Sequence, residues 1–248
     1  MRRTKEKAGI FLPVKREQVL EVDLDPWHRE VYETWLQRQR VKNLGEDGKV
    51  VNRFTALRSL TLLRQLCLDA GLIDDEHADL PSAKVDVLVE RLHELVSGGR
   101  RALVFSQFTR FLGKIRTRLA AEGLTCCYLD GQTLGRQQVV QAFQAGAAPV
   151  FLISLKAGGT GLNLTQADHC FLLDPWWNPA IEAQAIARIY RIGQTQEVNV
   201  CRLIARNTVE EKVRLLQVRK GQLFDSVLDG GRALPRGLGD DDLSELFD

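Results

Sequence analysis

The chain lacks several features that would assign it to common protein classes. No apolar run approaches the ~18 residues that a membrane-spanning helix needs, and the apolar stretch within MRRTKEKAGIFLPVK is too short for a signal peptide. We therefore expect a cytoplasmic chain without a membrane partner. The sequence holds neither a phosphate-cradling G-x-x-x-x-G-K-[ST] nor a G-x-G-x-x-G that opens a helix after the first strand. These absences argue against a self-sufficient nucleotide hydrolase and against a dinucleotide enzyme.

Cysteine and histidine are too scattered to predict a disulfide framework or a metal site. The five cysteines include no C-x-x-C pair, and most of them fall in strand-like runs, as reduced core thiols do. The four histidines have no ligand spacing, which favours surface or core imidazoles. We therefore predict no metal ligands in this chain.

What is present is the pattern of a parallel sheet covered by helices. With 44% apolar and 27% charged residues, the 248 residues describe a globular chain of one or two domains. Apolar runs alternate with segments of helical period, which predicts an α/β fold with a central, mostly parallel sheet. The expected strands are Ala102–Ser106, Thr125–Leu129, Val150–Ser154, Cys170–Leu173 and Val198–Ile204. The expected helices are Lys84–Val96, Phe108–Glu122, Arg136–Ala145, Pro179–Tyr190 and one that begins at Val209.

Three consecutive segments are predicted along the chain. Residues 1–81 form a connector and a helical appendage, with helices over Pro26–Val41 and Arg53–Ala70. Residues 82–207 form the α/β lobe, and residues 208–248 form a helix and a flexible acidic tail. The tail ends in LSELF, where Leu243, Leu246 and Phe247 share one helical face suited to docking.

The loops that follow the strands are the places to search for a site, because ligands of such folds sit outside the carboxyl ends of the strands. The loop SLKAGGTGLNL follows the strand FLIS and has three glycines, which permit close backbone approach to a phosphate or to another chain. Lys156 precedes these glycines and is suited to a phosphate contact. The net charge of +2 does not itself indicate a partner, but residues 179–220 hold eight Lys or Arg against four Asp or Glu.

The stretch FLLDPWWNPAIEAQAIARIYRIGQ predicts a helix that carries two arginines in one direction. Asn178 suits the N-cap and Pro179 the first helical position. At helical spacing, Gln184, Arg188 and Arg191 share one face beside an apolar stripe formed by Ile181, Ala185, Ile189 and Ile192. Two forked guanidiniums on one edge suit a planar, multiply charged target, and a structural salt-bridge pair is the alternative.

Five ordered segments together resemble one known family. RALVFSQFTRFL, LDGQT with Arg136, SLKAGGTGLNL, DPWWNPAIEAQA and ARIYRIGQ are similar to the C-terminal helicase-type lobe of the Swi/Snf family of DNA-translocating ATPases. The segments RRTKE, LRQLC and ELF also resemble that family. The resemblance therefore covers nearly the whole chain.

The resemblance implies a motor of two RecA-like lobes, with ATP between them and double-stranded DNA across both. This chain would be the C-terminal lobe, and the N-terminal lobe of the same parent protein would bind most of the ATP and its Mg²⁺. By matching positions, Arg191 would be the arginine finger on the γ-phosphate, with Arg188 beside it and Gln184 in support. The chain alone would be inactive, since it has the finger without the phosphate cradle.

Further positions are matched by the resemblance to the nucleotide cleft and the DNA. It implies that Trp177 couples DNA engagement to hydrolysis, whereas Trp176 is expected to be a hydrophobic plug. The implied nucleotide-cleft residues are Gly159, Gly161 and Asn163. The implied DNA-binding or coupling residues are Ser106, Gln107, Lys156, Ala157, Gly158 and Trp177.

Two departures and one alternative accompany this interpretation. The family usually has an acidic residue where this chain has Ala187, and a histidine where it has Tyr190. The alternative is a catalytically inactive binding module of the same fold, for nucleic acid or protein. Partners such as RNA polymerase or other DNA-bound proteins stay open. Richness in Ala, Arg and Leu favours a bacterial, nucleoid-associated protein, and a eukaryotic one would be nuclear.

Overall fold

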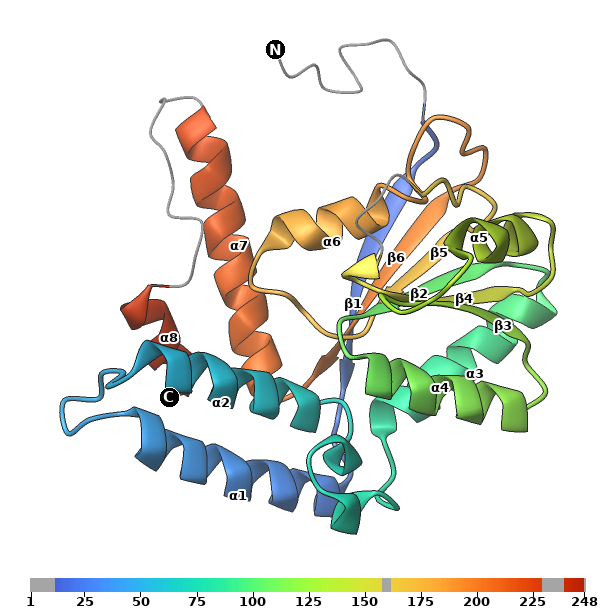
Figure 1. Ribbon diagram of the computed structural model, residues 1–248. Helices are drawn as coiled ribbons and strands as arrows, with labels where there is room; N and C mark the ends of the chain where they lie inside the picture. Colours follow the sequence, from blue (N-terminus) through green and yellow to red (C-terminus); the bar gives the residue numbers. More distant parts are fainter. Residues whose placement is uncertain (1–11, 158–161, 229–238, 248) are drawn as a thin grey trace. The chain divides into compact units, whose positions relative to one another are not determined.

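The computed structural model of the chain describes residues 12–157, 162–228 and 239–247 (Figure 1). The strands are β1 (Lys15–Val22), β2 (Ala102–Ser106), β3 (Cys126–Leu129), β4 (Val150–Ser154), β5 (His169–Leu172) and β6 (Val198–Ala205). The helices are α1 (Pro26–Asn43), α2 (Arg53–Leu66), α3 (Ala83–Ser97), α4 (Thr109–Ala121), α5 (Arg136–Gln144), α6 (Pro179–Ile186), α7 (Val209–Leu228) and α8 (Asp240–Phe247), with short 3-10 turns at Ala70–Leu72 and Asp75–His77.

The chain divides into two compact units, each built from three separated segments. The sheet unit comprises the described parts of Met1–Leu20, Leu88–Leu172 and Glu182–Arg202. The helical unit comprises the described parts of Glu21–Val87, Leu173–Ile181 and Leu203–Asp248. The units are therefore discontinuous in sequence, whereas the sequence predicts the consecutive segments 1–81, 82–207 and 208–248. The difference arises because residues 173–181 and the C-terminal helices pack with α1 and α2.

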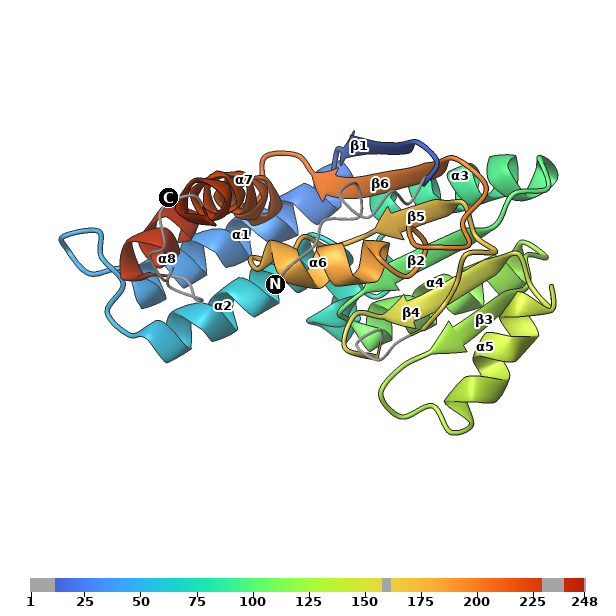
Figure 2. The same ribbon diagram turned by 90° about the horizontal axis from the view of Figure 1, so that it is seen from above.

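The six strands form one parallel sheet in the order β1-β6-β5-β2-β4-β3 (Figure 2). Pairing is parallel between β2 and β4, β2 and β5, β3 and β4, and β5 and β6. Val198 N–H donates to Val14 O and Arg206 N–H to Val22 O, both at 2.9 Å. The two bonds join residues at the same sequence separation, so β1 and β6 keep a constant register and run parallel. The central strands β2 and β4 are buried at every position, which is typical of parallel strands covered on both faces.

Helices cover both faces of the sheet. Figure 1 shows α3 and α4 on one face and α5 and α6 on the other. In α4, Phe111, Ile115 and Leu119 follow one helical stripe and are fully buried. The fold is thus the three-layer, RecA-like α/β arrangement that the sequence predicts, and the carboxyl ends of the parallel strands share one edge.

The helical unit is built from α1, α2, α7 and α8 around one apolar core. The Asp25 carboxylate accepts the Trp27 N–H at 3.0 Å at the start of α1. The Asn52 side chain accepts the Thr55 N–H at 3.1 Å at the start of α2. The Tyr32 hydroxyl of α1 accepts the N–H of Val209, the first residue of α7, at 2.7 Å. Side chains at helical spacing on α2, among them Ala56, Leu60 and Leu63, fill the core.

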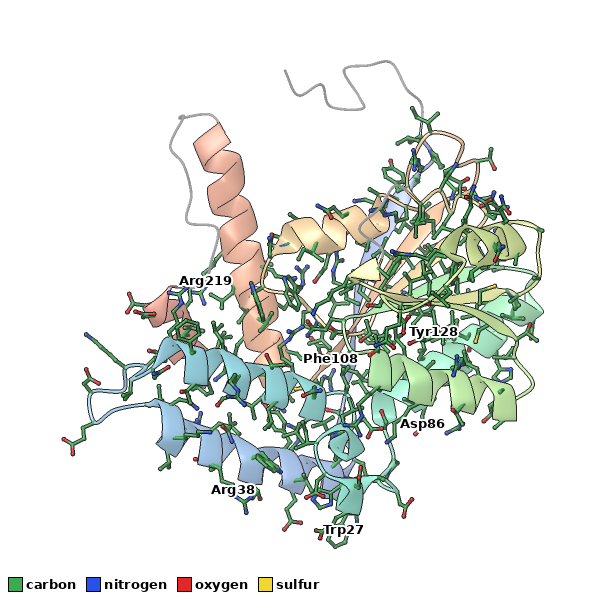
Figure 3. The ribbon with its side chains drawn as sticks, in the orientation of Figure 1. Trp27, Arg38, Asp86, Phe108, Tyr128 and Arg219 are labelled. Carbon is green, nitrogen blue, oxygen red and sulfur yellow. The ribbon has the colours of Figure 1, made fainter. Side chains whose placement is uncertain are left out.

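The end of the chain docks as the sequence predicts. Leu243, Leu246 and Phe247 of α8 are 0–1% exposed and belong to the core of the helical unit. Figure 3 shows Arg219 on α7, which forms an ion pair with Glu245 of α8 at 2.8 Å. Residues 239–247 are therefore a packed helix, while residues 229–238 of the predicted flexible tail lie outside the described residues.

Two other elements differ from the sequence prediction. Strand β1 is not predicted, because KREQVLEV is polar and only Val22 among its residues is buried. The predicted helix Arg53–Ala70 ends at Leu66 and is followed by the 3-10 turn Ala70–Leu72. No helix in the described part of the chain is long and apolar enough to cross a bilayer.

Candidate functional site

The carboxyl ends of β2 and β4 lie side by side in the sheet unit. Ser106 and Ser154 are register partners, and the Leu155 N–H donates to Ser106 O at 2.9 Å. The Ser106 side chain is fully buried, and its hydroxyl accepts the Phe108 N–H at 3.1 Å. Ser106 thus shapes the turn that presents the half-buried Gln107. A direct contact of its hydroxyl with DNA would require that turn to open.

The loop after β4 exposes one charge and anchors its backbone. Lys156 is exposed, whereas Ala157 is buried and its carbonyl accepts a hydrogen bond from the Arg136 guanidinium at 2.5 Å. Asn163 is exposed, and its carbonyl accepts from the Gln144 amide at 2.7 Å. The predicted positions Gly158, Gly159 and Gly161 lie outside the described residues.

The helix before the two arginines is shorter than predicted. The sequence predicts a helix over Pro179–Tyr190, but α6 ends at Ile186. Beyond it, Arg188 N–H donates to Ala185 O and Ile189 N–H to Ile186 O, both at 3.1 Å, whereas Tyr190 N–H donates to Ile186 O at 2.9 Å. These turns therefore mix i−3 and i−4 bonds and do not continue a regular helix. The turn then passes through Gly193, whose φ of +99° suits glycine.

This shortening changes how the predicted residues are presented. Ile189 is buried as expected, but Ile192 is 65% exposed and does not continue the apolar stripe. Gln184 is exposed on α6, whereas Arg188 and Arg191 project from the turns that follow. Of the three residues predicted to share one helical face, only Gln184 therefore lies on a helix.

The two guanidiniums are half-buried, and neither forms an ion pair with another described residue. The buried Nε of Arg188 has no hydrogen-bond partner within the same part of the chain. Nη1 of Arg191 donates to Leu162 O at 3.3 Å, and the Leu164 N–H donates to Arg188 O at 3.1 Å. Burial lowers the pKa of Arg188, and the charge of Arg191 lowers it further. Two cations held together without an acid favour an external anion as their partner.

The loop that follows β5 belongs to the helical unit and holds the predicted coupling residue. Trp176 and Trp177 stack with ring centroids 4.2 Å apart and an interplanar angle of 28°. Trp177 is partly buried and packs against the core of the unit. Arg64 of α2 lies over both indole rings, with its Cζ 5.1 Å from the Trp176 centroid and 5.4 Å from that of Trp177. Trp177 is thus in contact with a buried cation that the sequence does not predict.

The structure brings together the segment 162–164 and the two arginines, and it places Trp177 in the other unit. The sequence analysis does not predict the buried cations Arg64 and Lys84, each 1% exposed. A usable signal exists in their spacing. Arg64 follows the buried Leu60 by four residues on α2, and Lys84 precedes the buried Leu88 by four residues on α3.

Comparisons with known proteins all find similarity to helicase-type proteins. Residues 83–193 match the helicase conserved C-terminal domain family. The human SWI/SNF-related matrix-associated actin-dependent regulator of chromatin subfamily A member 1 is 36% identical over an alignment that covers 94% of this chain and 24% of that protein. The chain spans only 12% to 24% of the lengths of the curated relatives it matches.

Two solved structures extend the likeness to three dimensions. The C-terminal part of the Fun30 ATPase domain has a TM-score of 0.75 at 22% identity and covers 96% of each chain, which is a likeness of fold. The Sulfolobus solfataricus SWI2/SNF2 ATPase core, solved in complex with dsDNA, has a TM-score of 0.72 at 27% identity. That match covers 99% of this chain and 53% of the other.

Proposed function

Because the chain belongs to the Swi/Snf family of helicase-like ATPases as its C-terminal helicase lobe, we propose that it is one half of an ATP-dependent translocase on double-stranded DNA. The N-terminal lobe of the same parent protein holds ATP and Mg²⁺. This chain supplies the arginines and part of the DNA surface. Its place of action is then the DNA-containing compartment, the bacterial nucleoid or the eukaryotic nucleus.

The observation that carries the proposal is that Arg188 and Arg191 form no ion pair with a described residue. Arginines kept for structural reasons are normally paired or hydrogen-bonded when buried. Here neither forms an ion pair with a described residue, and the buried Nε of Arg188 has no acceptor among those residues. A phosphate oxygen would satisfy that donor, and Arg191, three residues further along the same turns, would bind the same phosphate group.

The chemistry assigned to these residues is electrostatic. As the terminal phosphoryl group of ATP is transferred to water, charge spreads over its equatorial oxygens, and a guanidinium stabilises that charge. Within the described residues, no group of three His, Cys, Asp or Glu side chains is placed to hold a metal ion. No step of the proposal uses a metal held by this chain.

The DNA contacts are assigned to Lys156, Gln107 and Trp177. Lys156 is exposed at the carboxyl end of β4, where it can meet a backbone phosphate as a point charge. Closure of the lobes around ATP and opening after hydrolysis would tighten and loosen this grip in turn. Base sequence should then matter little, because phosphate contacts carry no sequence information.

The test uses the protein that carries both lobes and compares Arg191→Ala with Arg16→Ala. Arg16 is an exposed arginine of the sheet unit that pairs with Glu197. Arg191→Ala should lower DNA-stimulated ATP turnover by about 10³-fold and leave DNA affinity near the wild-type value. Arg16→Ala should change neither. Near-normal turnover of Arg191→Ala would refute the finger assignment, and DNA binding by a wild type without DNA-stimulated hydrolysis would favour the binding module.

A further inference from the structure

Three backbone carbonyls in the loop after β5 are each held by a buried side chain from a different helix. The donors come from α3, α2 and α7, and all are at most 2% exposed. The bonds are Lys84 Nζ to Leu173 O at 2.7 Å, Arg64 Nη2 to Pro175 O at 2.6 Å and Gln217 Nε2 to Trp176 O at 2.5 Å. Loops usually satisfy their carbonyls with water, so this loop is unusually constrained.

Two of the three donors are charged and carry buried counter-ions. Arg64 pairs with Asp174 at 3.3 Å and Lys84 with Glu210 at 2.5 Å, and all four side chains are at most 1% exposed. Apolar side chains of similar volume often replace buried ion pairs without loss of stability. What such replacements cannot provide is a directional bond to a chosen carbonyl. The pairs are therefore better explained by the loop geometry that they set than by stability.

Arg64 contacts the functional part of the loop directly. Its guanidinium bonds to Pro175 O and lies over the stacked rings of Trp176 and Trp177. A planar cation with donors along its edges can bond in its plane and attract ring faces at the same time. A lysine at this position would keep the charge but would lose the planar fork.

We propose that Arg64 is a positioning residue that fixes the Trp176–Trp177 pair, so that DNA engagement at Trp177 is transmitted to ATP hydrolysis. This inference rests on the proposed function. When DNA contacts Trp177, a rigid loop moves as a whole and can shift the residues attached to it. In a loop with several indole orientations, the same contact would change only the orientation of the ring. Removal of Arg64 should therefore reduce the stimulation of hydrolysis by DNA more than it reduces binding of DNA.

The test variant is Arg64→Met with Asp174→Asn in the protein that carries both lobes. The pair is replaced as a unit because Arg64→Met alone would leave the Asp174 carboxylate buried and unpaired. Maximal DNA-stimulated turnover should fall by about 10-fold, with a smaller change in the DNA concentration that gives half-maximal stimulation. Arg64→Lys should lie between the variant and the wild type. Arg58→Met, an exposed arginine of the same helix, should match the wild type.

A double-mutant cycle separates positioning from general damage. In a Trp177→Ala background, the Arg64–Asp174 replacement should have little additional effect on stimulation, because both changes disable the same step. A purely structural role would lower turnover equally in both backgrounds, and that result would overturn the proposal.

A spectroscopic measurement does not depend on activity. Stacked indoles give an exciton couplet in circular dichroism, and the Arg64–Asp174 variant should lose most of the couplet that Trp177→Ala also removes. An unchanged couplet would overturn the positioning role, as would full DNA stimulation in a variant that has lost the couplet. A wild-type protein without DNA stimulation, or a Trp177→Ala protein with normal stimulation, would instead count against the proposed function.

Discussion

Lys84→Met is the substitution whose effect on stability follows most directly from the structure. Lys84 lies at the start of α3 with its side chain fully buried. Its ammonium group has three donors, and each has an acceptor: Leu173 O at 2.7 Å, Leu203 O at 3.0 Å and Glu210 Oε2 at 2.5 Å. Methionine has a similar length and no donor, so the substitution removes the bonds and the charge with little change of volume.

The expected loss is large because of what remains behind. The Glu210 carboxylate keeps a bond from the Ala205 N–H at 2.8 Å, but its Oε1 has no partner in the described structure. Breaking one side of a buried ion pair costs about 3–5 kcal/mol, mostly through the charge left unpaired. This is a large share of the ~5–15 kcal/mol that a typical domain has in total. We expect Lys84→Met to lower the free energy of unfolding by about 4 kcal/mol.

Urea denaturation of the 248-residue chain, followed by circular dichroism, measures this loss as a shift of the midpoint at constant slope. The double variant Lys84→Met with Glu210→Gln should recover most of it, since no charge is then left buried. Lys42→Met, on the exposed surface of α1, should stay within about 0.5 kcal/mol of the wild type. If Lys84→Met costs less than about 1 kcal/mol with an unchanged slope, the role assigned to the buried pair is wrong.

Three further outcomes are expected. Burial raises the pKa of Asp168, but hydrogen bonds from His169 and Arg100 outweigh burial and hold that pKa below its ordinary value. Its contribution to stability is thus present above the unfolded-state pKa of about 4 and lost as the pH falls through the folded-state pKa. The difference in unfolding free energy between wild type and Asp168→Asn should therefore shrink in acid, and a constant difference down to about pH 2 would contradict this. Phe247→Ala should lower the free energy of unfolding by about 3 kcal/mol in urea, because its ring is fully buried, and a loss under about 1 kcal/mol would show that α8 is not docked. Lys156→Ala should reduce the slope of log Kd against log salt for DNA by about 1, equally for different sequences, and an unchanged slope would exclude the phosphate contact.

The sheet can be predicted from the sequence because its central strands are buried on both faces. ALVFS and VFLIS are short apolar runs without alternation, and every residue in them is buried. Strand β1 cannot be predicted in this way. It lies at the edge of the sheet, exposes most of its side chains, and is a strand because it pairs with β6. The residue pattern of KREQVLEV does not indicate its pairing partner, β6, which lies about 180 residues further along the chain.

The candidate site is predictable to the extent that it depends on residue type and local spacing. The two arginines follow a helix as expected, but apolar period alone places the end of that helix too late, because Ile189 continues the buried stripe through turns. The buried charges depend on long-range contacts. The acceptors of Lys84 lie 89, 119 and 126 residues away, and Asp174 lies 110 residues from Arg64. Sequence shows a charge on an apolar stripe, but only the fold shows which carbonyls and carboxylates meet it.

The loop after β5 and the turns that carry Arg188 and Arg191 differ in how far their polar groups are hydrogen-bonded. This difference predicts which of the two segments moves when a ligand binds. The loop after β5 already has its carbonyls satisfied by Lys84, Arg64 and Gln217, so rearrangement would break bonds without forming better ones. The Nε of Arg188 is buried and has no partner in the described structure, which costs about 1–3 kcal/mol. The Arg191 guanidinium makes a long bond of 3.3 Å to Leu162 O among the described residues. An anion that reaches the arginines removes that cost and competes with a weak bond, so the arginine side chains should adjust to a phosphate while the tryptophan loop keeps its geometry.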